Sequence, residues 1–400
     1  MVEIPPSTER SSTPSSSTPR RSMQAIKPNA LRLQRIARTG KATFHDLVTL
    51  PTQKPVISQG PPGYSAVSGH TVTVFGSTGF LARYLVSKLG KIGTQVVVPY
   101  RDEDQARHLK LMGDLGQIVR MEWDIRDEKS IAECLRHSDT VYNLVGRDYP
   151  TKNFSYEDVH IRGPERMARI AREEGVSTFI QMSHLNADVN SASKFYATKA
   201  EGEARVKEIF PNATFVRPST MFGYEDKLLN NMAIWPIWWK LNNAETQIRP
   251  VHVMDVAQAL TNLLTMPKYS GVLNLPGPST LTYEYLLDMI STVTLRPPSK
   301  APALPKKLAQ LISEAGKGVW WPVLSSDEVT RRFINDSQVA GDWEAVGIEP
   351  SEIEDHAITY LRRYRSAFDY VRPVTFPPRP IIACKRFPVL VSKPLIDVIP

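Results

Sequence analysis

The sequence has few cysteines, no long apolar run and no basic stripe interleaved with stacking aromatics. Its two cysteines, Cys134 and Cys384, are too far apart for a disulfide framework, and neither lies in a CxxC or Cys/His cluster that would indicate structural zinc. No segment reaches the roughly 18 consecutive apolar residues that a membrane-spanning helix needs. These absences indicate a reduced compartment and argue against a protein metal site and a nucleic-acid partner. If the protein meets a membrane, we expect it to do so at the surface or through partners.

The first 45 residues contain only two acidic side chains, Glu3 and Glu9, and the whole chain has a net charge of +8. They are rich in serine, proline and arginine, and too polar to bury a core. Within them "ALRLQRIAR" has the pattern of a basic amphipathic helix. This composition is typical of a mitochondrial transit peptide, and a disordered basic segment is the alternative for residues 1–45. Residues 46–69 are then a proline- and glycine-rich linker.

From residue 70 the pattern changes to apolar strands alternating with amphipathic helices. "TVTVF", "QVVVPY", "TVYNLVG", "TFIQMS" and "ATFVRPS" are typical of strands, and "FLARYLVSKLGKIG" and "KFYATKAEGEARVKEIF" of helices. This alternation predicts an α/β domain with a Rossmann-type, doubly wound parallel sheet over residues 70–265. A smaller, mixed and mainly helical region that corresponds to a substrate domain is expected over residues 266–370, and an extended proline-rich tail over 371–400.

A glycine-containing turn follows the first predicted strand. In "VFGSTGFLA", glycine lets the chain turn tightly and lets backbone N–H groups approach a pyrophosphate, whose charge is favoured by a helix N-terminus. The position between a first strand and a long amphipathic helix makes this turn indicative of a dinucleotide site. The residues expected to contact the cofactor here are Gly76, Ser77, Thr78, Gly79, Phe80 and Leu81.

The end of the second predicted strand bears on the choice of nucleotide. NAD sites usually carry an acid there for the ribose hydroxyls, whereas arginine accommodates the 2′-phosphate of NADP. The sequence reads "VVVPYRDED", with Arg101 at or one past this position. We therefore expect NADP(H) in preference to NAD(H). Asp102, the next residue, leaves NAD(H) as an alternative cofactor. Arg101 could instead be a solvated loop residue.

Four later motifs, "EWDIRD", "YNLVGRD", "SKFYATKAEGE" and "VRPSTMFG", resemble those of the extended and atypical short-chain dehydrogenases. In that family the equivalent of Asp124 meets the adenine, the loop from Asn143 to Gly146 lines the dinucleotide, and the equivalent of Lys199 bonds the nicotinamide ribose. The segment from Pro218 closes over the nicotinamide. The resemblance thus implies cofactor contacts from Asp124, Ile125, Asn143, Leu144, Val145, Gly146, Ser183, Lys199 and Pro218.

The clustered motifs "MGDLGQ", "GRDYPTKNF", "QMSHLNA" and "TKAEGE" resemble one branch of that family, the nucleotide-binding accessory subunits of mitochondrial respiratory complex I. The resemblance covers residues 70–265 well and the C-terminal third loosely. It implies other complex I subunits as partners and a role in assembly and stability near the quinone-binding region. It also implies a peripheral position on the matrix side of the inner membrane.

The same resemblance leaves the active site incomplete. Short-chain dehydrogenases place their proton-donating tyrosine four residues before the lysine, and here that position is Phe195, which cannot exchange a proton. Tyr196 points about 100° away around the helix, and the family's serine falls at either Ser183 or His184. We therefore predict no catalytic residue. The alternatives are an NADP-dependent reductase or epimerase that uses Tyr196 and Lys199, with or without His184, and a dinucleotide-sensing regulator.

Two tryptophan-containing segments have several interpretations. "IWPIWWK", with Trp235, Trp238 and Trp239, falls where extended family members place a substrate lid. "GVWWPVL", with Trp320 and Trp321, has lysines nearby, so contact with a membrane surface is one interpretation. Core packing is the main expectation for the tryptophans of both segments.

Overall fold

The computed structural model describes residues 46–49, 55–58, 67–234, 240–266, 269–297, 302–316 and 325–379. These residues belong to one compact unit. The predictions for the transit peptide (1–45), for much of the linker, for the five tryptophans Trp235, Trp238, Trp239, Trp320 and Trp321 and for tail residues 380–400 lie outside the described residues.

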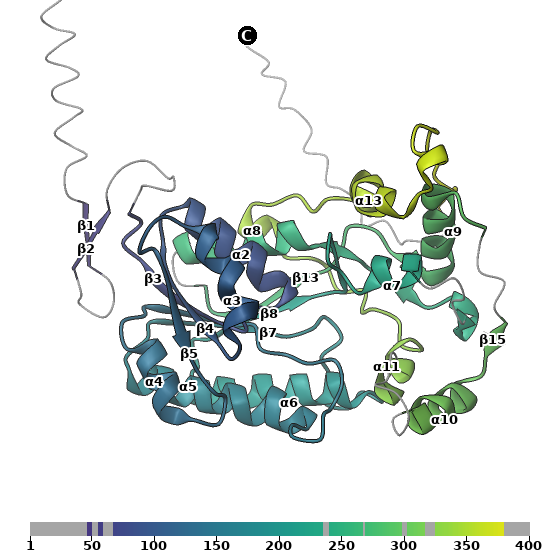
Figure 1. The fold of residues 1–400 in the computed structure, drawn as a ribbon. Coiled ribbons are helices and arrows are strands. Elements are labelled where there is room, and N and C mark those ends of the chain that lie inside the picture. Colours follow the sequence, from purple (N-terminus) through teal and green to yellow (C-terminus); the bar gives the residue numbers. More distant parts are fainter. Residues whose placement is uncertain are drawn as a thin grey trace, which may run out of the picture. The chain divides into compact units, whose positions relative to one another are not determined.

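Seven parallel strands form the central sheet (Figure 1), in the spatial order β13-β8-β7-β6-β3-β4-β5. The strands are β3 (Thr71–Phe75), β4 (Gln95–Tyr100), β5 (Ile118–Glu122), β6 (Thr140–Asn143), β7 (Thr178–Met182), β8 (Thr214–Pro218) and β13 (Gly271–Leu275). The chain therefore winds outward in both directions from β3. The predicted Rossmann-type, doubly wound sheet is confirmed, and its seventh strand, β13, lies beyond the expected boundary at residue 265.

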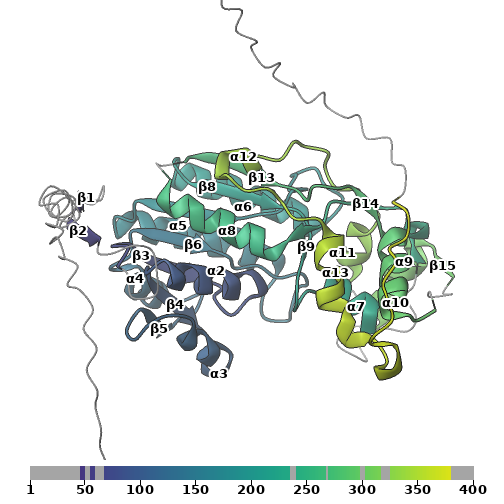
Figure 2. The same ribbon diagram turned by 90° about the horizontal axis from the view of Figure 1, so that it is seen from above.

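Helices cover both faces of this sheet, which explains why the strands are rich in β-branched residues. On one face lie α2 (Phe80–Lys91) and α8 (Val253–Thr265), which pack side by side and share a core with α12 (Trp343–Val346) (Figures 1 and 2). On the other face lie α4 (Glu128–Leu135), α5 (Gly163–Glu173) and α6 (Lys194–Ile209). The short α3 (Glu103–Ala106) and η1 (Arg107–Met112) connect β4 to β5.

The C-terminal region is mixed and mainly helical, as predicted. Its helices α7 (Leu228–Ile234), α9 (Tyr283–Thr294) and α13 (Ile353–Leu361) enclose a third apolar core. Two further helices, α10 (Lys306–Gly316) and α11 (Ser326–Arg331), meet around Ala309 and Val329. Among the described helices, none combines the length and apolar character that a bilayer crossing requires.

Short strand pairs and helical turns complete the described fold. The pairs are β1 (Asp46–Thr49) with β2 (Pro55–Ser58), β9 (Met221–Phe222) with β12 (Val251–His252), β10 (Lys240–Leu241) with β15 (Ala303–Leu304), and β11 (Gln247–Ile248) with β14 (Leu281–Thr282). The turns are η2 (Asp158–Arg162), η3 (Asn242–Ala244), η4 (Arg362–Tyr364) and η5 (Ala367–Asp369).

Candidate dinucleotide site

The glycine turn after β3 lies against the loop that follows β6, at the point where the strand order reverses. Gly76 has a φ of +77°, and a Cβ at this position would lie 3.0 Å from the backbone of Leu144. The amide of Gly79 donates to the carbonyl of Gly76 at 3.0 Å, and Gly79 is the N-cap of α2. Ligands of open α/β sheets bind at this reversal point, outside the carboxyl ends of the strands. Glycine at position 76 therefore allows the turn after β3 to approach the loop after β6 closely.

A cavity of about 190 Å³ lies beside this turn. It brings together nine of the residues predicted from separate parts of the sequence: Gly76, Ser77, Thr78, Gly79, Arg101, Ile125, Leu144, Val145 and Gly146. The other lining residues, which the sequence did not single out, are Pro99, Tyr100, Trp123, Arg147, Phe154 and Val159. Pro99, Tyr100 and Trp123 stand at or just after strand ends, a signal that could have identified them. Phe154 and Val159 come from the crossover before α5 and carry no such local signal.

Two predicted residues shape the cavity through bonds within the protein. The fully buried Ser77 donates from Oγ to the carbonyl of Pro99 at 2.8 Å, which ties the glycine turn to the end of β4. Asn143 is also fully buried, and its Nδ2 donates to Gln181 Oε1 at 2.7 Å. Its Oδ1 accepts from the amide of Val145 at 3.1 Å, so the side chain of Asn143 fixes the loop that lines the cavity.

His160 is a further positioning residue of this loop. Its Nε2 accepts a hydrogen bond from the amide of Arg147 at 3.2 Å, and its Nδ1 lies 3.1 Å from Thr198 Oγ1 on α6. Burial, with a smaller contribution from Lys199, holds the pKa of His160 well below its ordinary value. The imidazole is therefore neutral, with its proton on Nδ1, and connects the loop after β6 to α6.

Four other predicted residues do not line this cavity. Leu81 packs in the core between the sheet and the helices, and Phe80 packs edge-on against Tyr84. Asp124 is exposed, and its carboxylate accepts from the amide of Arg126 at 2.7 Å in the turn after β5. The carbonyl of Pro218, at the end of β8, accepts from the amide of Leu185.

Lys199 and Ser183 lie behind the loop after β6, outside the lining of the cavity. Lys199 Nζ donates to the carbonyl of Met182 at 3.3 Å, and a Cβ on Gly146 would lie 3.2 Å from it. Burial lowers the pKa of Lys199 to about 8, against the opposing effects of Asp148 and Glu203. The buried Ser183 Oγ has no hydrogen-bond partner among the described residues. Two polar groups thus retain hydrogen-bonding capacity at the place where the resemblance to short-chain dehydrogenases implies contact with the nicotinamide ribose.

These residues fit a dinucleotide. The close glycine turn leads into a helix N-terminus, where backbone N–H groups without intrahelical partners suit a pyrophosphate. Arg101 and Arg147 line the cavity as cations. Ser183 Oγ and Lys199 Nζ can take further hydrogen bonds. Within the described residues, no group of three or more His, Cys, Asp or Glu is arranged to hold a metal ion.

Phe195, which the resemblance to short-chain dehydrogenases aligns with the family's tyrosine, is a buried aromatic ring without an acidic proton. The guanidinium of Arg331 lies 4.5 Å from the ring centre of Phe195, and Lys199 Nζ lies 5.9 Å from it. The ring of the neighbouring Tyr196 packs against the imidazole of His184, with 4.7 Å between the two ring centres. The Tyr196 hydroxyl forms a hydrogen bond with the side chain of Asn186.

Neither Tyr196 nor His184 titrates near neutral pH. Burial raises the pKa of Tyr196 far above its ordinary value. Burial, together with Arg331 and Lys199, lowers the pKa of His184 to about 3. A tyrosine that stays protonated and an imidazole that stays neutral make a poor acid and base pair.

Comparison with known proteins shows the family to which the chain belongs. The profile of the NmrA-like family matches residues 68–355. The chain is 44% identical over 363 residues to the mitochondrial NADH-ubiquinone oxidoreductase 40 kDa subunit of Neurospora crassa, covering 89% of this chain and 93% of that one. It is 39% identical over 322 residues to the mitochondrial NADH dehydrogenase (ubiquinone) 1 alpha subcomplex subunit 9 of Rattus norvegicus, covering 78% and 85%.

Solved structures share the fold at low identity. The Citrobacter sp. triphenylmethane reductase complexed with NADP(H) matches with a TM-score of 0.56 and 14% identity, covering 73% of this chain and 99% of that one. At this identity the likeness concerns the fold alone.

Proposed function

Because the chain belongs to the NmrA-like family and, within it, to the complex I subunits that it matches over most of their length, we propose that it is an accessory subunit of mitochondrial complex I that binds NADP(H) as a structural cofactor. One observation carries this proposal. The glycine turn and the loop after β6 frame a cavity, with Lys199 directly behind that loop, whereas Phe195 stands where the resemblance to short-chain dehydrogenases places the proton donor.

A cofactor held in this way stabilises the fold without turnover. A ligand that binds only the folded state adds about 2.7 kcal/mol of stability at a concentration 100 times its Kd. When bound, the nicotinamide ring would supply hydride chemistry, but Phe195 has no acidic proton, and neither Tyr196 nor His184 titrates near neutral pH. The chain's own residues bind and orient the dinucleotide: the turn at Gly76 receives the pyrophosphate, and Lys199 receives the nicotinamide ribose.

The charges at the end of β4 favour NADP(H) over NAD(H). Arg101 is exposed and lines the cavity, where its guanidinium can bond a 2′-phosphate with charge-assisted hydrogen bonds. Asp102, the acid that could hold the ribose hydroxyls of NAD(H), is the N-cap of α3 and accepts from the amide of Asp104 at 3.1 Å. The carboxylate of Asp102 thus already caps a helix, whereas the guanidinium of Arg101 can bind the nucleotide.

The proposed surroundings are the other subunits of complex I, on the matrix side of the inner membrane and near the quinone-binding region, where the chain supports assembly and stability. A surface contact with the membrane is part of this proposal. The helix α10 exposes Leu308, Leu311 and Ile312, and begins with Lys306 and Lys307. Apolar side chains beside lysines suit the headgroup boundary of a bilayer.

The test combines binding, turnover and assembly. Isothermal titration calorimetry of the purified chain should give a saturable NADPH site with weaker NADH binding. Incubation with NADPH and a panel of aldehydes, ketones and quinones should give no steady oxidation. Native electrophoresis of gently solubilised mitochondria should find the chain in the complex. Oxidation of NADPH that disappears in Tyr196→Phe would instead establish the reductase alternative, and a chain that runs mainly as a free monomer would refute the subunit role.

A further inference from the structure

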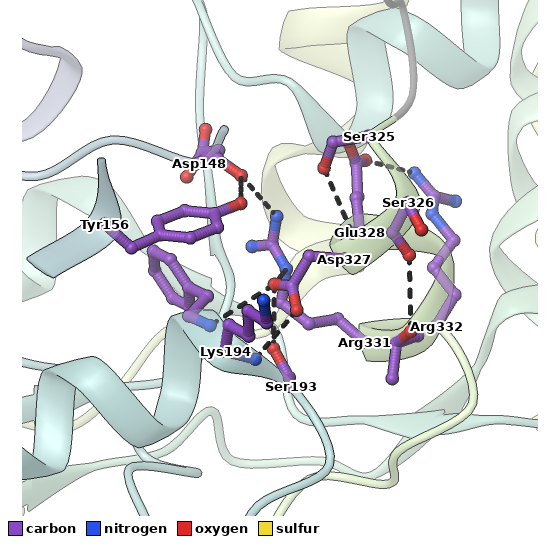
Figure 3. A network of polar contacts seen from close by, with 12 residues as sticks. Asp148, Tyr156, Ser193, Lys194, Ser325, Ser326, Asp327, Glu328, Arg331 and Arg332 are labelled. Carbon is purple, nitrogen blue, oxygen red and sulfur yellow. Dashed lines mark hydrogen bonds and ion pairs between the residues drawn. The ribbon is translucent and has the colours of Figure 1, made fainter. Parts of the chain in front are cut away.

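A segment of the C-terminal region, residues 325–337, closes the N-terminal end of α6 (Figure 3). The carboxylate of Asp327 accepts hydrogen bonds from Ser193 Oγ at 2.8 Å and from the backbone amides of Lys194 at 2.8 Å and Phe195 at 3.3 Å. The first amides of a helix have no intrahelical partners, and Ser193, the N-cap of α6, makes no side-chain cap bond. Asp327 therefore caps α6 from a distant part of the sequence.

Arg331 from the same segment contacts the other side of the candidate site. Its guanidinium lies 4.5 Å from the ring centre of Phe195. It also donates to the carbonyl of Asp148 at 3.0 Å (Figure 3). Asp148 follows Gly146 by two residues, in the loop that lines the cavity. Its carboxylate pairs with Lys227 Nζ at 2.6 Å. Arg331 thus connects α11 with both the helix that carries Lys199 and the loop over the dinucleotide.

The end of the segment binds the loop that follows β7. Asn186 Nδ2 donates to Asp336 Oδ1 at 2.9 Å, and Asn186 Oδ1 accepts from the amide of Ser337 at 2.8 Å. Asp336 is buried, and its other carboxylate oxygen accepts from the amide of Arg249 at 2.8 Å. Asn186 lies just past the unsatisfied Ser183. The segment 325–337 therefore contacts α6, the loop after β6 and the loop after β7.

From these contacts we propose that docking of the segment 325–337 and binding of the dinucleotide stabilise each other, with Asp327 and Arg331 as positioning residues for the nucleotide site. The inference rests on the proposed binding of NADP(H). In this proposal, bound dinucleotide orders the loop at Gly146 and the side chain of Lys199. These lie beside Asp148 and Phe195, the two residues that Arg331 contacts. Coupling between two binding events is reciprocal, so loss of segment docking lowers nucleotide affinity by the factor by which nucleotide favours docking.

The test measures both directions of this coupling on the full purified chain. Hydrogen exchange with and without NADPH should show slower exchange over residues 325–337 when NADPH is bound. Titration calorimetry should show NADPH affinity reduced in Asp327→Asn and Arg331→Gln by about 5-fold or more, the lower end of typical coupling. Arg331→Lys keeps the charge and should recover part of the affinity. The matched control is Arg205→Gln, on the far part of α6, where Arg205 pairs with Glu208. It should bind as the unmodified chain does.

The outcomes separate the two proposals. If the unmodified chain binds NADPH, unchanged exchange over 325–337 overturns the coupling. Affinities within twofold in both variants overturn the positioning role of Asp327 and Arg331. Either result leaves the proposed function standing. If the unmodified chain binds no NADPH, both proposals fail. A variant that does not fold does not weaken the test, because the exchange measurement on the unmodified chain decides by itself.

Discussion

Replacement of Gly76 by alanine should damage both stability and nucleotide binding. The residue has a φ of +77°, a conformation that costs a non-glycine residue roughly 1–2 kcal/mol. Its new Cβ would meet the backbone of Leu144 at 3.0 Å, where no flexible side chain can move aside. Overpacking of this kind typically costs about 1–3 kcal/mol. We therefore expect the free energy of unfolding to fall by about 2–5 kcal/mol in total.

Gly175 provides the matched control. It has a nearly identical φ of +74°, but a Cβ there would meet nothing within 4 Å. Gly175→Ala should thus lose only the conformational part, about 1–2 kcal/mol, and should bind NADPH normally. In Gly76→Ala the glycine turn and the loop at Leu144 must separate. Loss of one hydrogen bond to a charged phosphate, about 1.5–3 kcal/mol, would weaken NADPH binding by about tenfold or more.

The assay is denaturant unfolding of both variants, followed by titration calorimetry with NADPH. Equal losses of stability in Gly76→Ala and Gly175→Ala would show that the approach to Leu144 carries no strain. Unchanged NADPH affinity in Gly76→Ala would refute the assignment of this turn as the pyrophosphate cradle.

Three further predictions concern charge and polarity at the site. In Arg101→Gln, NADPH affinity should fall by about 10-fold or more while NADH affinity stays constant in calorimetry, because the lost charge-assisted bonds reach only the 2′-phosphate; equal loss for both nucleotides would contradict this role. In Ser183→Ala, the free energy of unfolding without ligand should stay constant or rise, since an unsatisfied buried hydroxyl is removed; NADPH binding should weaken, and unchanged binding would remove Ser183 from the site. Because the folded pKa of Lys199, about 8, lies below the unfolded value of 10.5, the unfolded chain holds the extra proton between these pH values. The Lys199 contribution to stability therefore rises with pH through this window. Relative to Lys199→Met, the unmodified chain should gain up to about 3 kcal/mol in denaturant titrations between pH 8 and 10.5, and a flat difference would mean that Lys199 is solvated.

Much of the nucleotide half of the site could be predicted from the sequence because its signals are local. A β-branched run, a glycine turn and an amphipathic helix follow one another directly, and the turn then stands where the sheet order reverses. Arg101 follows from its place at the end of a strand. The mainly helical region predicted after residue 265 contains α9, α10 and α13. Their apolar spacing gave a sufficient signal.

The contacts around Phe195 could not be predicted in this way. Asp327 caps α6 from more than a hundred residues away, and nothing in "SSDEVTRR" distinguishes it from an exposed acidic residue near a helix start. Arg331 could equally have been solvated. The role of His160 depends on two bonds to elements that are distant in sequence. Tertiary packing determines which residues become hydrogen-bond partners over such distances, and the spacing of residues along the chain does not predict it.

The pairing of β13 with β8 limits how the protein can be divided. Residues Gly271–Leu275 cover the side of β8 over its whole length, from Thr214 to Pro218. A fragment ending at residue 265 would keep the nucleotide residues yet present β8 as a bare edge, whose open N–H and C=O groups invite pairing with other chains. Residues 70–265 therefore carry the candidate dinucleotide site but need β13 to cover the edge of their sheet and keep it from aggregating.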